Sequence, residues 1–374
     1  MTARRRFPGV PLLAALLPGA LMTAALLAGA LAGCTPKLAP PGPGATTPRL
    51  ELGRLNERSA AAALVAADGL ALPLRAWLPE QDAQPGAQPG AQSAAQSGTR
   101  APEAVILALH GFNDHSGAFA SPAPALAARG FAVYAYDQRG FGAGPNPGLW
   151  AGAGRLAEDA RQALALLAER HPGRPLYLLG ESMGAAVALL ATGRPGATPV
   201  PANLRGLILS APAVWSSDLQ PWYQRWALWL SVRLVPGLAP SGRSTGMQAS
   251  DNIEALRALG RDPLVIKYSR IDTVQGLVEL MSRGLEAAPS VRLPALLLYG
   301  EHDELIPARP VEMLWEALPE GPESHLVVYE DGWHMLLRDL QAEVVLEDIA
   351  AWIARPGLTP PSITVGLAGD SVER

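Results

Sequence analysis

The chain of 374 residues has little cysteine, since Cys34 is its single one. An internal disulfide and a cysteine-ligated metal site are therefore excluded, and so is a thiolate nucleophile in any domain that follows Cys34. Histidine is also scarce, and its six copies show no H-E-x-x-H or similar spacing, which argues against a metal hydrolase. We expect no cofactor and no metal. The formal net charge of −4 disfavours nucleic acid as a partner.

The amino-terminal segment lacks acidic residues. Three arginines at 4–6 precede an apolar run over 10–31, which leads into Leu31-Ala32-Gly33-Cys34. This pattern resembles a bacterial lipoprotein signal with its lipobox, so residues 1–33 would be cleaved and Cys34 would carry lipid. Cleavage removes three arginines and no acid, which takes the formal charge from −4 to −7. We expect a lipid-anchored protein of the bacterial cell envelope, at the outer membrane in a diderm; the alternative is an uncleaved membrane anchor.

The remainder of the chain divides by composition. We expect a flexible spacer rich in proline and glycine over 34–59, one domain over 60–354 and a disordered tail over 355–374. A low-complexity stretch at 81–100 is predicted to be a solvated loop of that domain. Apolar strand patterns alternate with helical ones through most of the domain. This alternation predicts an α/β fold with a mostly parallel, doubly wound sheet.

The stretch Gly180-Glu181-Ser182-Met183-Gly184 lies between a buried-strand pattern and a small-residue helix pattern. A serine on such a turn exposes its Oγ above the sheet, and the flanking glycines avoid collisions with neighbouring backbone. A second G-x-S-x-G match at 242–246 follows a run broken by proline and glycine, with no strand before it. We therefore predict Ser182 as the nucleophile and interpret Ser244 as a loop serine.

The acid and the histidine are expected after the serine in chain order, each at the carboxyl end of a later strand. Asp303 follows a strand pattern at 294–299 and is the predicted acid; Glu301 and Glu304 are weaker candidates. His334 follows the next strand pattern and is the predicted general base. His325 opens that same strand and belongs to the opposite edge of the sheet.

The oxyanion of an ester intermediate needs two N–H donors. In hydrolases with a nucleophile elbow, one comes from the residue after the nucleophile and one from an earlier strand-to-helix loop. The backbone N–H groups of Met183 and Phe112 are the predicted donors, because Phe112 follows a buried strand pattern at 104–109. The neighbouring His110 and His115 are expected to hold the loop by hydrogen bonds rather than to act in catalysis.

Five motifs in this order resemble the monoacylglycerol lipase and lysophospholipase group of α/β-hydrolases, the serine-aminopeptidase-like hydrolases. They are the H-G-x-x-x-H-S loop at 110–116, the D-Q-R-G-F-G turn at 137–142, the elbow, the G-E-H-D acid loop at 300–303 and the histidine loop. Gln138, Gly144 and Asp114 depart from residues that are common in the group. The resemblance implies an α/β-hydrolase fold with a helical cap, at about 212–289, where the alternation of strands and helices stops.

Trp222, Trp226 and Trp229 fall at helical spacing within the expected cap. They are predicted either to pack the cap onto the core or to line a groove for an acyl or aromatic substrate.

The predicted activity is hydrolysis of a carboxylic ester through a Ser-Asp-His triad and an acyl-enzyme. The resemblance implies monoacylglycerols or lysophospholipids as the small-molecule substrates. Two alternatives stay open: a peptidase or aryl esterase of the same fold, and a catalytically inactive binding lipoprotein of the envelope.

Overall fold

The computed structural model describes residues 35–52, 62–80, 100–216, 221–241 and 246–362. Cys34, Ser244, most of the predicted tail and the predicted signal peptide lie outside these ranges. Among the described helices, none combines the length and apolarity that a bilayer crossing requires.

Within the described ranges, one nine-stranded sheet has the order β1-β2-β3-β5-β4-β6-β7-β8-β9. The strands are β1 (Arg49–Glu51), β2 (Ala62–Val65), β3 (Ala71–Trp77), β4 (Ala104–Leu109), β5 (Phe131–Tyr136), β6 (Leu176–Glu181), β7 (Leu204–Ser210), β8 (Ala295–Gly300) and β9 (His325–Tyr329). The first three pair antiparallel, β3 pairs antiparallel with β5, and all pairs from β5 to β9 are parallel. The predicted α/β-hydrolase architecture is confirmed.

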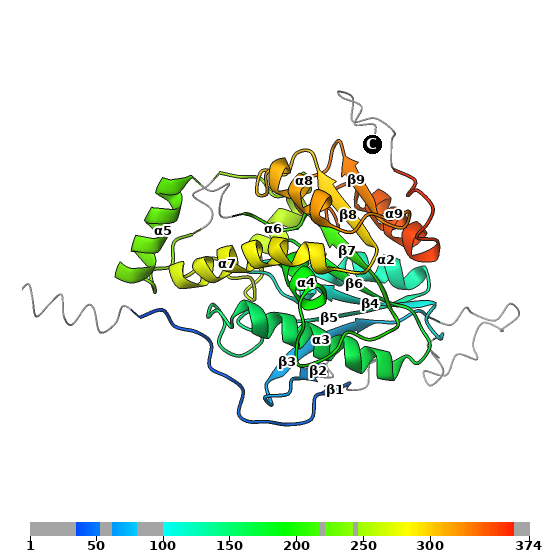
Figure 1. The fold of residues 1–374 in the computed structure, drawn as a ribbon, viewed down its shortest axis with the longest axis horizontal. Coiled ribbons are helices and arrows are strands. Elements are labelled where there is room, and N and C mark those ends of the chain that lie inside the picture. Colours follow the sequence, from blue (N-terminus) through cyan, green and yellow to red (C-terminus); the bar gives the residue numbers. More distant parts are fainter. Residues whose placement is uncertain (1–34, 53–61, 81–99, 217–220, 242–245, 363–374) are drawn as a thin grey trace, which may run out of the picture.

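Helices cover both faces of the sheet (Figure 1). Those of the alternating part are α2 (Pro122–Ala128), α3 (Ala153–Arg170), α4 (Met183–Gly193), α8 (Ala308–Ala317) and α9 (Ala342–Ala354). Side chains of α3, α4 and α8 pack into one core layer, and those of α2 and α9 into the other. Every residue of β4, β5, β6 and β8 is buried because both faces of these strands are covered.

In its described residues, the segment between β7 and β8 carries three α-helices: α5 (Trp222–Leu234), α6 (Ile253–Arg261) and α7 (Ile271–Ala287). The carboxyl-terminal half of α7 packs against α4, where a Cβ on Gly284 would lie 3.2 Å from the Ala186 Cβ. In contrast, α5 has no buried residue. Figure 1 shows α5 at the margin of the molecule, beyond the amino-terminal end of α7. This segment occupies the region where the cap was predicted.

Residues 35–52, named here the amino-terminal strap, run along the surface of the domain. The Lys37 N–H donates to Asp272 Oδ2 at 3.0 Å, and the Ala39 N–H donates to the Trp150 carbonyl at 2.8 Å. The strap ends in β1, which pairs with β2. The sequence predicted a flexible spacer here; proline and glycine content indicates an irregular backbone but does not show which N–H groups find acceptors on the domain.

Candidate active site

Ser182 lies in the turn between β6 and α4, with φ 54° and ψ −115°. A positive φ costs a non-glycine residue on the order of 1–3 kcal/mol, so surrounding contacts must hold it. The Ser182 N–H donates to the Ser210 carbonyl at 2.9 Å, and the Ser182 carbonyl accepts from the Ala213 N–H at 3.0 Å. The turn is therefore fixed by the end of β7 and the residues after it.

Glycine is required on both sides of Ser182. A Cβ on Gly180 would lie 2.4 Å from the Ala185 nitrogen, and one on Gly184 would lie 2.1 Å from the Leu109 oxygen. Such separations are far below van der Waals contact with backbone atoms that have little room to move. The two glycines allow β6, α4 and the end of β4 to meet tightly under the serine.

Asp303 and His334 follow the adjacent parallel strands β8 and β9 and meet directly. His334 Nδ1 lies 2.8 Å from Asp303 Oδ2, and both side chains are buried. Asp303 Oδ1 accepts the N–H groups of Leu305 and Ile306 at 2.8 and 2.9 Å. The carboxylate is thus held at both oxygens, and Nδ1 of the imidazole is assigned the hydrogen, which leaves Nε2 as an acceptor.

The loop after β4 lies against the nucleophile. A Cβ on Gly111 would lie 3.4 Å from the Ser182 Cβ and 3.9 Å from its Oγ. Phe112 is the next residue of this loop, and its ring packs edge-on against Phe141 at 5.6 Å. Met183 is the first residue of α4, and the first N–H groups of a helix have no acceptor within it. Both predicted oxyanion donors thus belong to backbone segments adjoining Ser182.

The loop histidines are held as expected. His110 is fully buried; its Nε2 accepts the Gln138 N–H at 2.9 Å, while its Nδ1 lies 2.8 Å from the Gly111 carbonyl. Burial lowers the pKa of His110, so the ring is neutral and donates through Nδ1. His115 Nδ1 accepts the Gly117 N–H, and its Nε2 lies 3.0 Å from Asp262 Oδ2 at the end of α6.

The other residues considered for the triad lie elsewhere. His325 Nε2 lies 3.0 Å from the Pro356 carbonyl, at the amino end of β9. Glu304 accepts the Gln248 N–H at 2.6 Å, and Glu301 is an exposed loop residue. Trp222, Trp226 and Trp229 are 73, 60 and 45% exposed on α5, so they lie outside the core.

Sequence reasoning missed a buried ion cluster around Arg338, four residues after His334. Arg338 Nη2 donates to Glu181 Oε1 at 2.6 Å, and Nη1 donates to Asp114 Oδ2 at 2.8 Å. Glu181 immediately precedes the serine, and Asp114 belongs to the loop after β4. One guanidinium therefore joins the serine, oxyanion and histidine loops. The one signal in the sequence was Glu181, a carboxylate at the carboxyl end of a buried strand, because a buried charge needs an opposite charge nearby.

Asp339, the residue after Arg338, connects the loop that carries His334 to the cap segment. Its Oδ2 accepts the Trp333 N–H at 2.9 Å, and its Oδ1 accepts the Ser250 hydroxyl at 2.5 Å. Burial is the main cause that raises the pKa of Asp339. The residue before His334 is thereby tied to the segment between α5 and α6.

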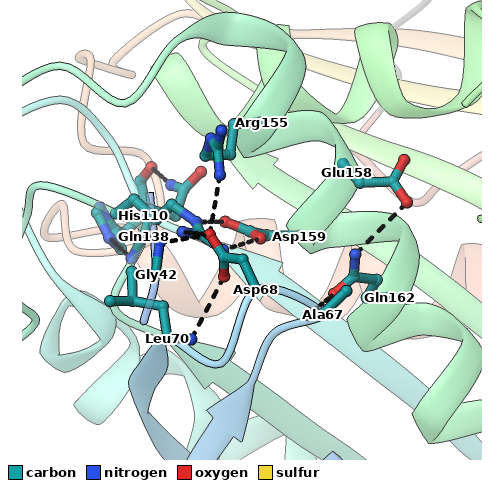
Figure 2. A network of polar contacts seen from close by, with 11 residues as sticks. Gly42, Ala67, Asp68, Leu70, His110, Gln138, Arg155, Glu158, Asp159 and Gln162 are labelled. Carbon is teal, nitrogen blue, oxygen red and sulfur yellow. Dashed lines mark hydrogen bonds and ion pairs between the residues drawn. The ribbon is translucent and has the colours of Figure 1, made fainter. Parts of the chain in front are cut away.

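A second buried cluster supports the oxyanion loop from behind (Figure 2). Arg139 pairs with Asp159 of α3 and, at 2.7 Å, with Asp68 of the β2–β3 turn. The hydrogen bond from Arg139 holds the pKa of Asp68 well below its ordinary value, whereas burial raises the pKa of Asp159 to about 6. Gln138, beside Arg139, donates through Nε2 to the His110 carbonyl at 2.8 Å. The cluster thus connects the β2–β3 turn to the loop facing Ser182.

Within the described ranges, no group of three or more His, Cys, Asp and Glu side chains is arranged to hold a metal ion. Ser182, Asp303 and His334 follow the carboxyl ends of the parallel strands β6, β8 and β9, so they lie at one edge of the sheet.

Comparison with known proteins gives consistent matches. A family model described as "Serine aminopeptidase, S33" matches residues 100–341. A monoacylglycerol lipase of Mycolicibacterium smegmatis is 28% identical over 67% of this chain and 88% of its own. The human monoglyceride lipase is 27% identical over 78% of this chain and 89% of its own.

Solved structures share the fold. The Paleococcus ferrophilus monoacylglycerol lipase gives a TM-score of 0.56 at 24% identity, covering 68% of this chain and 96% of that one. A soluble variant of the Saccharomyces cerevisiae monoglyceride lipase, solved with a substrate analogue, gives 0.61 at 18% identity, covering 83% and 100%.

Proposed function

The chain belongs to the serine aminopeptidase S33 family and is a carboxylic ester hydrolase, and from that premise we propose that it cleaves monoacylglycerols or lysophospholipids. The relatives named monoacylglycerol or monoglyceride lipase support this substrate class, since they match most of their own length. The Asp303 to His334 contact at 2.8 Å, at the same edge of the sheet as the serine on its strained elbow, is the observation that carries the mechanism.

In the proposed reaction Ser182 Oγ attacks the ester carbonyl while His334 Nε2 takes its proton. Asp303 orients the imidazole through Nδ1 and stabilises the imidazolium that forms. The carbonyl oxygen becomes an oxyanion that accepts the N–H groups of Phe112 and Met183. His334 returns the proton to the leaving alcohol. Water then attacks the acyl-enzyme by the same route, releasing the fatty acid and restoring Ser182.

The acyl chain is proposed to bind along the aromatic side chains of Trp222, Trp226 and Trp229. Their exposure on α5 supports this choice over a purely structural role, because side chains that fasten a cap onto a core would be buried against it. Apolar and aromatic walls with few polar groups suit fatty acyl chains.

A fluorophosphonate probe tests the nucleophile, because it reacts with an activated serine hydroxyl. We expect peptide mass mapping to find the adduct on Ser182, with Ser244 in the second G-x-S-x-G match unmodified as an internal control. The Ser182→Ala variant should take up no probe. An adduct on Ser244, or none on folded protein, contradicts the mechanism.

A peptidase is the second candidate, favoured by the name of the matching family. A panel of monoacylglycerols, lysophospholipids and aminoacyl amides assayed on the same preparation separates the two. Faster turnover of the amides assigns the enzyme to peptide hydrolysis. Labelling of Ser182 without turnover of any of the three classes would support the inactive binding protein instead.

We also propose that lipid on Cys34 anchors the mature protein to a membrane of the bacterial envelope. The lipobox-like sequence before Cys34 supports this proposal. Cys34→Ser should block lipidation and processing. An intact mass that retains residues 1–33 in the native protein would refute maturation as a lipoprotein and favour an uncleaved anchor.

A further inference from the structure

The stretch of the cap between α6 and α7, residues 262–269, contacts the loop after β4 and is named here the inner cap segment. The Ile266 N–H donates to the Asn113 carbonyl at 2.9 Å, and Asn113 Nδ2 donates to Ser269 Oγ at 2.7 Å. Asn113 directly follows Phe112, whose N–H is a predicted oxyanion donor. Two hydrogen bonds from the cap therefore hold the residue next to that donor.

The same loop is held by the cap at a second place. His115 Nε2 lies 3.0 Å from Asp262 Oδ2, and the imidazole is almost completely covered. The other carboxylate oxygen of Asp262 accepts the Leu264 N–H at 2.8 Å, which fixes the side chain within the inner cap segment. The cap contacts thus lie on both sides of Asp114, so this part of the loop cannot shift unless the inner cap segment shifts with it.

Asparagine is an expensive residue at position 113. Its φ of 65° lies in the left-handed region, which glycine adopts without cost. Asn113 Oδ1 is buried and has no hydrogen-bond partner within the described ranges, and burying an unpaired carbonyl oxygen is unfavourable. The single hydrogen bond from Nδ2 is a small net contribution against these two costs. Residues that depart from the most stable choice are expected where a function depends on them.

The cap also contacts the loop of the general base. The Met335 N–H donates to the Ala249 carbonyl at 2.9 Å, and Met335 directly follows His334. Ala249 precedes α6, and the inner cap segment follows it. A short, regular helix keeps its two ends at a fixed separation. Residues 249–269 therefore connect the loop that carries His334 to the loop that carries Phe112.

We propose that Asn113 is a positioning residue for the ester hydrolysis, and that its hydrogen bond to Ser269 lets the cap fix the Phe112 N–H where the oxyanion forms. The inference rests on the proposed function, because it takes this N–H as an oxyanion donor. Such a donor must lie within about 2.7–3.1 Å of the oxyanion, so a small displacement weakens it. The cap then contributes to the chemical step as well as to substrate binding.

Two variants break this hydrogen bond from opposite sides. Asn113→Gly keeps the left-handed backbone and removes the donor, and Ser269→Ala removes the acceptor. Loss of one oxyanion donor costs roughly 10²- to 10³-fold in kcat, and misplacement should cost less. We expect each variant to lower kcat for p-nitrophenyl acetate by about 10-fold with KM changed by less than about 2-fold, and the double variant to be no worse because both remove the same interaction. The acetyl group is used because it offers α5 little to bind.

The conservative and matched variants separate positioning from a structural role. Ser269→Thr keeps the hydroxyl and should retain the wild-type kcat. Ser282→Ala removes another cap hydroxyl, which donates to the Trp215 carbonyl at 3.0 Å, and should also retain it. A trifluoromethyl ketone, which forms an anionic adduct on Ser182, should lose affinity for the Ser269→Ala variant by the same factor as kcat. Wild-type kcat in both single variants, or losses that multiply in the double variant, would overturn the proposal.

The position of the donor is also measurable without a substrate. The chain has five phenylalanines, so labelling the full-length protein with ¹⁵N-phenylalanine gives few amide signals. The buried Phe119, Phe131 and Phe141 are internal references. We expect the order parameter of the Phe112 N–H to be about 0.85 in the wild type and to fall towards about 0.6 in Ser269→Ala. An unchanged value overturns the proposal. If the value falls but the wild type hydrolyses no ester, the proposed function fails while the hold of the cap on this loop is confirmed.

Discussion

The edge of the sheet that carries Ser182, Asp303 and His334 and the exposed helix α5 depart from the usual distribution of side chains in opposite ways. At the edge, the carboxylate of Glu181 is buried and the side chain of Arg338 is largely covered, but each has an opposite charge within 3 Å. On the cap, the large rings of Trp222 and Trp226 are exposed, and α5 has no buried residue. The charges at the edge find their partners across the sheet, whereas the exposed rings contact only neighbours on their own helix and otherwise face solvent. The edge is therefore fixed by folding alone, while the cap is suited to contacts made after folding.

The largest expected effect separates chemistry from folding at the edge. Ser182→Ala and His334→Ala should each lower kcat by on the order of 10⁴- to 10⁶-fold, and the double variant should be little worse because the residues act as a unit. His325→Ala is the matched control, since His325 lies at the opposite edge of the sheet. Steady-state kinetics on folded variants decide the matter. An equal loss of kcat in the control would contradict the assignment of the general base.

Arg338→Met tests whether the buried charges at the edge are as interdependent as their contacts indicate. The variant leaves Asp114 and Glu181 buried without a cation, so the free energy of unfolding should fall by about 3–5 kcal/mol. Adding Glu181→Gln should recover part of that loss. The control is Arg309→Met, whose partner Glu312 lies 3.1 Å away on an exposed surface, and it should leave the free energy of unfolding nearly unchanged. Urea unfolding measures all three, and equal costs at both arginines would mean that the cluster is not coupled.

The stability of the domain should depend on pH through partly or fully buried groups such as His171 and Asp159. The arginines of the cap stay charged over the same pH range and contribute no such dependence. Burial lowers the pKa of the half-buried His171 to about 4, so the folded form resists protonation that the unfolded chain accepts. Stability should therefore decline as pH falls from about 6.5 towards 4, by about 1 kcal/mol after allowance for partial exposure. The raised pKa of Asp159 has the opposite effect on stability. The quantity to measure is therefore the difference in the free energy of unfolding between the wild type and His171→Asn, followed as a function of pH. A difference that does not change with pH would contradict the assigned shift.

The smallest expected change in stability is at the cap. Trp226→Ala should alter the free energy of unfolding by less than about 0.5 kcal/mol, because the ring is exposed. Its effect should appear with substrate: kcat/KM should rise with acyl length, each methylene contributing up to about 0.8 kcal/mol, and the variant should flatten that rise. A chain-length series of p-nitrophenyl esters measures it, with Leu340→Ala as an exposed apolar control. A profile unaltered in the Trp226 variant would remove α5 from acyl binding.

The elbow, the parallel sheet and the Asp303 and His334 loops were predictable because each depends on neighbours in sequence. Gly180 and Gly184 flank the serine, and strand β4 has the bounds that the apolar run at 104–109 predicted. Strand ends then place side chains at one edge by topology alone. These local patterns were sufficient to predict the architecture.

The Arg338 cluster and the strap could not be found in the same way. Arg338 is separated from Asp114 by 224 residues and from Glu181 by 157, and no periodic pattern connects positions so distant. The exposure of α5 was also beyond prediction, because a row of aromatic residues at helical spacing fits a buried face equally well. What covers a helix depends on tertiary contacts rather than on its own sequence.

The hydrogen bond between Lys37 and Asp272 closes a loop of 235 residues. Contacts so far apart in sequence form late, because most of the chain must be ordered before their ends can meet. During synthesis, Asp272 leaves the ribosome only after the seven described strands β1 to β7, and β8 and β9 follow it. Docking of the strap is thus among the last events of folding, and protection of the Lys37 amide from hydrogen exchange would report that the molecule is complete.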